Sequence, residues 1–163
     1  MSGWDQYITG MIVNKQIPTG WLQNMVQEAA IFTHDGTLLA ATPGFNLGEY
    51  VFDAKVSDTE VEKVPVNEKL IATTVVLTGN PKVCKAGVRI NNTKYTLASY
   101  DADHKLAYFS KVGGGACARA TKTVIVFAAY SGKLKMSNGV EQSAGICNER
   151  IDAVCDLLIK GGC

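Results

Sequence analysis

Several features of membrane, secreted and disordered proteins are missing from this sequence. Its 163 residues include only four prolines and no low-complexity tract, which argues against long disordered segments. No apolar run approaches the roughly 18 residues of a membrane-spanning helix, and residues 123–130, among the longest, have the length of a strand. The N-terminus also lacks the basic and apolar regions of a secretion signal, so we expect a cytoplasmic protein.

An excess of charge of one sign is missing as well. Sixteen Lys and Arg residues balance fifteen Asp and Glu residues, and the formal net charge is +1. A nearly neutral chain has no overall field that would attract nucleic acid, so we expect no nucleic-acid partner. With 47% hydrophobic residues, a chain of this length can bury one core, which predicts a single domain over residues 1–163.

Groups that carry chemistry are few. The five cysteines are odd in number, widely spaced and without a CxxC pair, which favours reduced thiols over a disulfide framework or a zinc site. The two histidines, His34 and His104, fall in expected turns, where a solvated side chain is the common outcome. Nucleophile elbows, phosphate-binding glycine loops and calcium loops are absent from the sequence. We therefore predict no enzymatic activity, no cofactor and no metal site.

Apolar spacing predicts a helix at each end of the chain. After a capping box at Ser2, an apolar face runs from Trp4 to Ile12 with helical spacing. Ser143 is a suitable N-cap for the last helix, which the Gly161-Gly162 pair would end. Two shorter helices are expected over residues 19–26 and 47–54, the second followed by a charged surface excursion over 58–69.

The stretches between these helices predict an antiparallel sheet. An Asp35-Gly36 turn joins a strand over 29–33 to a strand over 37–41. Six further β-rich runs cover residues 71–77, 87–90, 95–100, 106–111, 116–120 and 124–130. The turns between them are too short for parallel crossovers. We therefore predict an α+β fold: a central, mostly antiparallel meander with the N- and C-terminal helices packed on one face.

The order of these features resembles the profilin family. The resemblance rests on the Trp4 and Tyr7 pair in the first helix, the Asp-Gly hairpin after residues 29–31, the glycine run over 111–116, and Gly145-Ile146-Cys147-Asn148 at the start of the last helix. It covers essentially the whole chain, which is longer than a typical profilin at residues 17–27, 50–85 and 133–142. It implies a cytoplasmic, cytoskeletal protein that binds monomeric actin and promotes nucleotide exchange on actin. It further implies binding of proline-rich segments and, as in some profilins, of phosphoinositides.

The resemblance also implies the residues that would bind actin. The matching family positions are Lys94, Lys111, Gly145 and Asn148, and Arg119 on the neighbouring strand joins them by position. Lysines at such positions can steer association with an acidic actin surface, and Asn148 near a helix start can hydrogen-bond across an interface.

A second set of positions corresponds to the groove that binds proline-rich segments between the terminal helices. These positions are Trp4, Tyr7, Leu39, Leu157 and Cys163. Flat aromatic rings cover proline faces, while ring N–H and O–H groups bond the exposed carbonyls. Leu39, Leu157 and Cys163 replace aromatic or polar residues of the family, so we expect weak binding or a groove shifted toward Trp21.

Two other classes remain open from the sequence. An adaptor or sensory domain of PAS-like or roadblock-like type would bind a small ligand or a partner subunit in the concave face of the sheet. It would be favoured by a buried apolar pocket and by Lys94 and Lys111 facing different directions. A small enzyme would have only His34, His104 and the thiols to work with.

Overall fold

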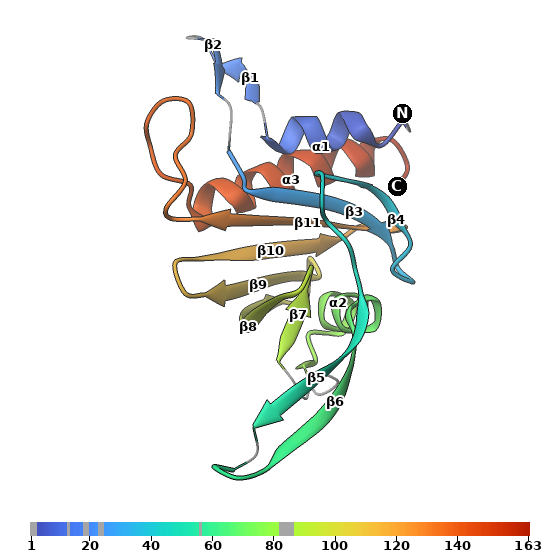
Figure 1. Ribbon diagram of the computed structural model, residues 1–163. Coiled ribbons are helices and arrows are strands. Elements are labelled where there is room, and N and C mark those ends of the chain that lie inside the picture. Colours follow the sequence, from blue (N-terminus) through green and yellow to red (C-terminus); the bar gives the residue numbers. More distant parts are fainter. Residues whose placement is uncertain (1–2, 13, 18–19, 23–24, 56, 82–86) are drawn as a thin grey trace.

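The computed structural model describes residues 3–12, 14–17, 20–22, 25–55, 57–81 and 87–163 (Figure 1). In chain order the elements are α1 (Asp5–Ile12), β1 (Asn14–Ile17), β2 (Gly20–Leu22), β3 (Glu28–Thr33), β4 (Leu38–Ala41), β5 (Glu49–Lys55), β6 (Val61–Asn67), α2 (Glu68–Thr78), β7 (Val88–Ile90), β8 (Thr93–Asp101), β9 (Leu106–Lys111), β10 (Gly114–Ala120), β11 (Val124–Ser131) and α3 (Ala144–Lys160). The predicted first helix is confirmed, although its expected cap, Ser2, lies outside the described residues. No helix of the described residues has the length and apolar character needed to cross a membrane.

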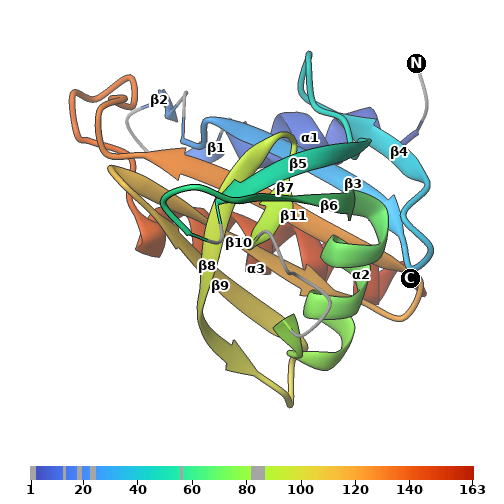
Figure 2. The same ribbon diagram turned by 60° about the horizontal axis from the view of Figure 1, so that its bottom comes forward.

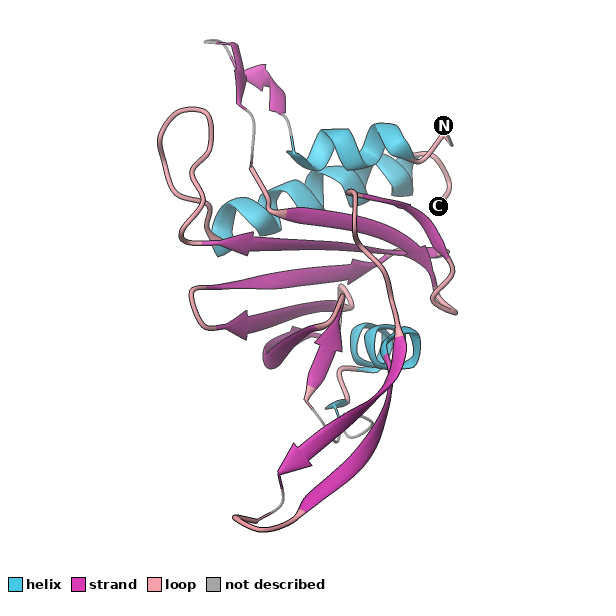
Figure 3. Cartoon of the chain, viewed as in Figure 1, coloured by secondary structure: helices cyan, strands magenta, loops and turns pink. Residues whose placement is uncertain are grey.

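A seven-stranded sheet in the order β4-β3-β11-β10-β9-β8-β7 forms the centre of the molecule. Every neighbouring pair in it is antiparallel. Strands β7 to β11 follow one another as a meander, and the β3–β4 hairpin adds to the far side of β11, as Figure 3 shows in magenta. The predicted antiparallel meander and the Asp-Gly hairpin are therefore confirmed.

Helices cover both faces of this sheet. The alternation of side chains along β11 divides the core, because Val124, Val126 and Ala128 pack in the cluster under α1 and α3. The intervening Ile125, Phe127 and Ala129 pack in the cluster under α2. A strand buried on both faces reads as one continuous apolar run, which is the pattern of residues 124–130. The two terminal helices lie on one face as predicted, and α2 lies on the other (Figures 1 and 2).

The strand predicted over residues 71–77 is wrong, because this segment lies in helix α2. The prediction followed its β-branched residues, but both ends of the segment carry helix caps. The Asn67 Oδ1 atom accepts a hydrogen bond from the Leu70 N–H, and Gly79, at φ 70°, ends the helix in the left-handed conformation. Burial at helical spacing, at Ile71 and Val75, then outweighs the weak local preference for strand.

The helices predicted over 47–54 and 19–26 are also wrong. Residues 49–55 form β5, which pairs with β6 so that Tyr50 lies opposite Val66 and Phe52 opposite Val64. These two strands form a separate hairpin, the arm (residues 49–67), which extends away from the terminal helices (Figure 1). The arm contains most of the predicted charged excursion. Residues 20–22 form β2, which pairs with β1, and the other residues of that predicted helix are non-helical or outside the described residues.

The thiols of the described residues are free. Cys117, Cys147 and Cys155 are buried, and Cys163 is half-buried. The Cys117 and Cys147 sulfurs lie 3.3 Å apart under α3. Cys84 lies outside the described residues.

Candidate functional site

The central sheet has an open area next to α3. Helix α3 packs on β10 and β11, and α1 packs on β3 and β4. On that side of the sheet, β8 and β9 are therefore covered by neither terminal helix. Thr96, Ala98 and Ser110 are therefore exposed on this face. We call this area, bounded by the first half of α3, the open face. Small and polar side chains on a wide sheet surface leave room for a partner to approach.

The two predicted lysines lie at one end of the open face but leave the sheet on opposite sides. Lys94 is exposed, and its neighbour Tyr95 is buried under α2, so Lys94 points to the side of the open face. The Lys111 Nζ atom instead lies 5.4 Å from the centroid of the Tyr95 ring. Thr96 pairs with Ser110, so both lysines lie at the same end of the paired strands β8 and β9.

At the other end of β9 lies a polar groove of about 380 Å³. Leu106 marks this end, five residues from Lys111, or about 17 Å along an extended strand. The groove is lined by Asp101, His104, Leu106, Tyr108, Arg119, Asn148, Asp152 and Asp156. The open face thus has a basic end and an end with three carboxylates, a polarity that the sequence prediction did not include.

Arg119 is engaged within this groove. Its Nη1 atom lies 2.9 Å from the Asp152 Oδ1 atom and 3.9 Å from the Asp156 Oδ1 atom, with only 13% of its side chain exposed. A guanidinium at this depth needs a carboxylate partner, so Arg119 ties α3 to β10. Its Nε atom and the Asn148 Oδ1 atom are buried and have no hydrogen-bond partner among the described residues.

Asn148 and Gly145 bring α3 to the open face. The side chain of Ser143 caps the helix by accepting a hydrogen bond from the Ile146 N–H. Gly145 is exposed in the first turn, and Asn148 lies one turn further on, where it lines the groove. Asn148, Asp152 and Asp156 follow at intervals of four residues, so the helical spacing carried a signal for the acidic end. The structure brings Lys94, Arg119, Gly145 and Asn148 to the open face and leaves Lys111 at its edge.

Two titratable groups of the groove have shifted pKa values. His104 Nδ1 lies 2.8 Å from the Asp101 Oδ2 atom, and this hydrogen bond lowers the pKa of the Asp101 carboxyl. Burial raises the pKa of the Tyr108 hydroxyl. A small apolar hollow of about 150 Å³ lies beyond Tyr108, between the sheet and the start of α3.

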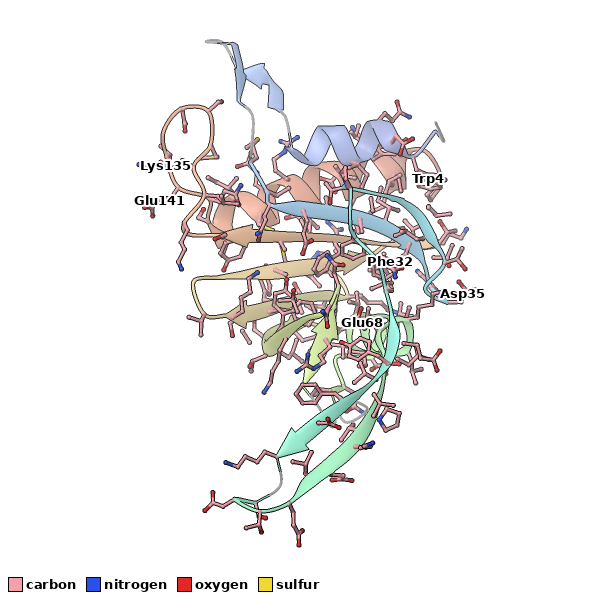
Figure 4. The ribbon with its side chains drawn as sticks, viewed as in Figure 1. Trp4, Phe32, Asp35, Glu68, Lys135 and Glu141 are labelled. Carbon is pink, nitrogen blue, oxygen red and sulfur yellow. The ribbon has the colours of Figure 1, made fainter. Side chains whose placement is uncertain are left out.

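The predicted groove for proline-rich segments lies at the ends of α1 and α3. The Trp4 and Tyr7 rings are tilted by 49° with centroids 5.9 Å apart. Trp4, Tyr7, Leu39 and Cys163 all pack against the same hydrophobic cluster between the terminal helices and the sheet. Figure 4 shows Trp4 at the start of α1, at the end of the molecule where both termini lie.

The C-terminal tail is held in place beside this groove. The Cys163 N–H donates to the Leu158 carbonyl, and the Cys163 carbonyl accepts from the Thr123 N–H at 3.2 Å. Leu157 does not join the other four residues, because α3 buries Val154 and Leu158 and leaves Leu157 58% exposed. The side chain of Trp21 lies outside the described residues.

The histidines do not form a catalytic group. His34 Nε2 contacts the Thr121 carbonyl at 2.9 Å, and His104 pairs with Asp101. Within the described residues, no three His, Cys, Asp or Glu side chains are grouped as a metal site.

Comparison with known proteins identifies the family. The profilin family model matches residues 2–163. The chain is 31% identical to a profilin from Tetrahymena pyriformis over 163 residues, covering 99% of both chains. Both findings agree with the resemblance seen in the sequence.

Solved structures show the same fold. Acanthamoeba castellanii profilin IA superposes with a TM-score of 0.66 at 17% identity, covering 99% of this chain and 100% of that one. Schizosaccharomyces pombe profilin gives a TM-score of 0.64 at 18% identity with the same coverage. Mouse profilin IIa, solved in complex with a double repeat from the FH1 domain of mDia1, gives a TM-score of 0.57 at 15% identity and equal coverage. The chain therefore belongs to the profilin family, whose members are non-enzymatic actin-binding proteins of the cytoskeleton.

Proposed function

We propose that residues 1–163 act as one domain that binds monomeric actin through the open face and promotes nucleotide exchange on it. The observation that carries this proposal is the uncovered surface of β8 and β9 beside α3, with Lys94 on the sheet and Gly145 and Asn148 on the helix that borders it. A preformed surface that is basic at one end and acidic at the other can align a partner of opposite polarity.

Nucleotide exchange would follow from differential binding. A protein that binds one conformation of actin more tightly shifts actin toward that conformation, without forming or breaking a covalent bond. An open nucleotide cleft would then release its ligand faster. The proposal places the protein in the cytoplasm and at the actin cytoskeleton.

The experiment is a titration of the protein into monomeric actin, following both polymerisation and the release of a fluorescent nucleotide. Lys94→Glu should weaken both effects, because it places an acid at the basic end of the open face. Lys122→Glu is the matched control, since Lys122 is exposed in the turn between β10 and β11. No effect of the wild-type protein at concentrations well above micromolar would overturn the proposal.

We further propose weak binding of proline-rich segments to the exposed parts of Trp4 and Tyr7. The structural neighbour solved with a proline-rich FH1 repeat supports this partner class. Only two aromatic rings are present among the described groove residues, with aliphatic and thiol side chains around them. We therefore expect an affinity weaker than a groove with more rings would give.

The adaptor alternative keeps one supporting observation. Lys94 and Lys111 do leave the sheet on opposite sides, which was the expected sign of an adaptor. The hollow between the sheet and α3, however, holds about 150 Å³, below the roughly 300–1,000 Å³ of typical small-molecule sites. Failure of the actin titration would favour the adaptor with a protein partner.

A further inference from the structure

The β9–β10 turn and the loop after β11 lie side by side, and both carry exposed aliphatic side chains. Val112, at the tip of the turn, is fully exposed, and Leu134 and Val140 of the loop are 41% and 52% exposed. The Gly132 N–H donates to the Gly113 carbonyl at 2.8 Å, which joins the two segments. We call Val112, Leu134 and Val140 the apolar edge.

The loop that carries two of these residues is firmly braced. The Met136 N–H donates to the Val140 carbonyl, and the Gln142 N–H donates to the Leu134 carbonyl at 2.9 Å. Lys135 and Glu141 form a β-bridge between these bonds, and Figure 4 shows both on the loop that projects beside the start of α3. Met136 and Gln142 are buried beneath it. Leu134 and Val140 are thus held in position before any partner arrives.

Three lysines lie next to the apolar edge along the chain. Lys111 directly precedes Val112, and the side chain of Lys133 lies close to Gly113. Lys135 is exposed on the loop as well. An apolar centre with a charged rim is the usual anatomy of a protein–protein interface. Three lysines alone, at about 1 kcal/mol each near an anionic bilayer, would not hold a protein stably on a membrane.

The apolar edge continues the open face. Lys111 and Lys94 share this end of the sheet, and the loop runs through Ser143 into the first turn of α3, where Gly145 is exposed. A partner bound to the open face could therefore also contact the loop. The described solvent-exposed valines of the arm lie elsewhere, beyond α2.

We infer that the apolar edge is an additional actin contact that anchors monomeric actin by burying Val112, Leu134 and Val140. This inference rests on the proposed function. Truncating interface aliphatics at a buried centre should weaken binding, whereas the same truncation outside an interface should not.

The test compares two pairs of valine substitutions in the full chain. We expect Val112→Ser with Val140→Ser to raise the Kd for monomeric actin at least about tenfold. Val51→Ser with Val61→Ser, at arm positions that are 61% and 62% exposed, should leave it unchanged. Leu134→Ser should act in the same direction as the first pair. Equal melting temperatures would show that every variant is folded.

The outcomes separate the two proposals. If wild-type protein binds actin, Lys94→Glu weakens binding and the Val112/Val140 pair does not, the open face stands and the additional contact is overturned. If wild-type protein does not bind actin, both fall. Loss of binding to phosphatidylserine vesicles in the Val112/Val140 pair, with actin affinity unchanged, would also overturn the inference and assign the edge to a membrane.

Discussion

Glu68 offers the sharpest test of how the arm is attached to the rest of the molecule. It is 1% exposed, at the first position of α2, and Figure 4 shows it where the arm meets the helix. Its Oε1 atom accepts a hydrogen bond from the Gly48 N–H at 2.9 Å. Its Oε2 atom accepts from the Tyr50 hydroxyl and from the Asn92 N–H, both at 2.8 Å. One carboxylate therefore joins the arm, α2 and the β7–β8 turn.

The magnitude follows from these three bonds. A hydrogen bond to a charged group contributes about 1.5–3 kcal/mol, and a buried donor left unpaired costs about 1–3 kcal/mol. Asn92 is exposed and Tyr50 and Gly48 are half-buried, so water can replace part of the loss. We expect Glu68→Ala to lower the free energy of unfolding by about 3 kcal/mol. We expect Tyr50→Phe, which removes one bond, to lower it by about 1 kcal/mol.

Denaturant unfolding measures both changes in the free energy of unfolding, and a double-mutant cycle isolates the interaction between Glu68 and Tyr50. The coupling between Glu68 and Tyr50 should be about 1 kcal/mol, because they share one hydrogen bond. Glu62→Ala, at an exposed arm position, should change the free energy of unfolding by less than about 0.5 kcal/mol. Glu68→Ala also removes the anchor of the arm, so amide exchange of the arm should speed up more than that of β11. A loss below about 1 kcal/mol for Glu68→Ala would refute this account.

Three further predictions concern the groove, the thiols and pH. Trp4→Ala should abolish binding of a proline-rich peptide, measured by calorimetry, with little change in melting temperature; a large fall would show that Trp4 serves the core instead. Burial raises the pKa of Cys155 to about 12, so this thiol should resist labelling at pH 8 until the protein unfolds. The half-buried Cys163 should react faster, so Cys163→Ser should reduce the amplitude of the fast labelling phase of the folded protein. Burial raises the pKa of Glu28, while its hydrogen bond from Asn91 opposes the shift. The Glu28 contribution is therefore most favourable at low pH and declines as pH rises from the ordinary value of 4.5 through the raised one, and Glu28→Gln should flatten the pH dependence of unfolding in that range.

Helix α2 and the arm show where local sequence was insufficient. Residues 73–76 are β-branched and favour a strand by propensity, yet α2 forms because Asn67 and Gly79 cap it and because the sheet covers one side of it. Apolar and polar residues alternate along much of the arm, but the apolar residues of β5 also fit the spacing of a helix. Only the pairing of β5 with β6 selects the strand.

The residues of the candidate site are those that the resemblance to profilins implies, and the structure supplies their arrangement. The sequence could place Gly145 and Asn148 in the first turns of the last helix, because Ser143 caps α3, but their proposed role came from the resemblance. Arg119 was expected by its position to join the residues that contact actin, but Asp152 lies across the interface between helix and sheet and pairs with it. Partners on different elements cannot be inferred from spacing along one chain segment.

Local sequence was sufficient to predict the elements with strong local signals: the capped last helix, the Asp-Gly hairpin and the buried strand over 124–130. Their periodicity and turn chemistry act within a few residues, so no distant partner is needed to specify them. Three features became visible only in the folded chain: the side of the sheet from which Lys111 emerges, the pairing of Arg119 with α3, and the hydrogen bond that joins Gly113 to Gly132. These depend on strand register and on which face each helix covers, and both are set by burial of the whole core at once.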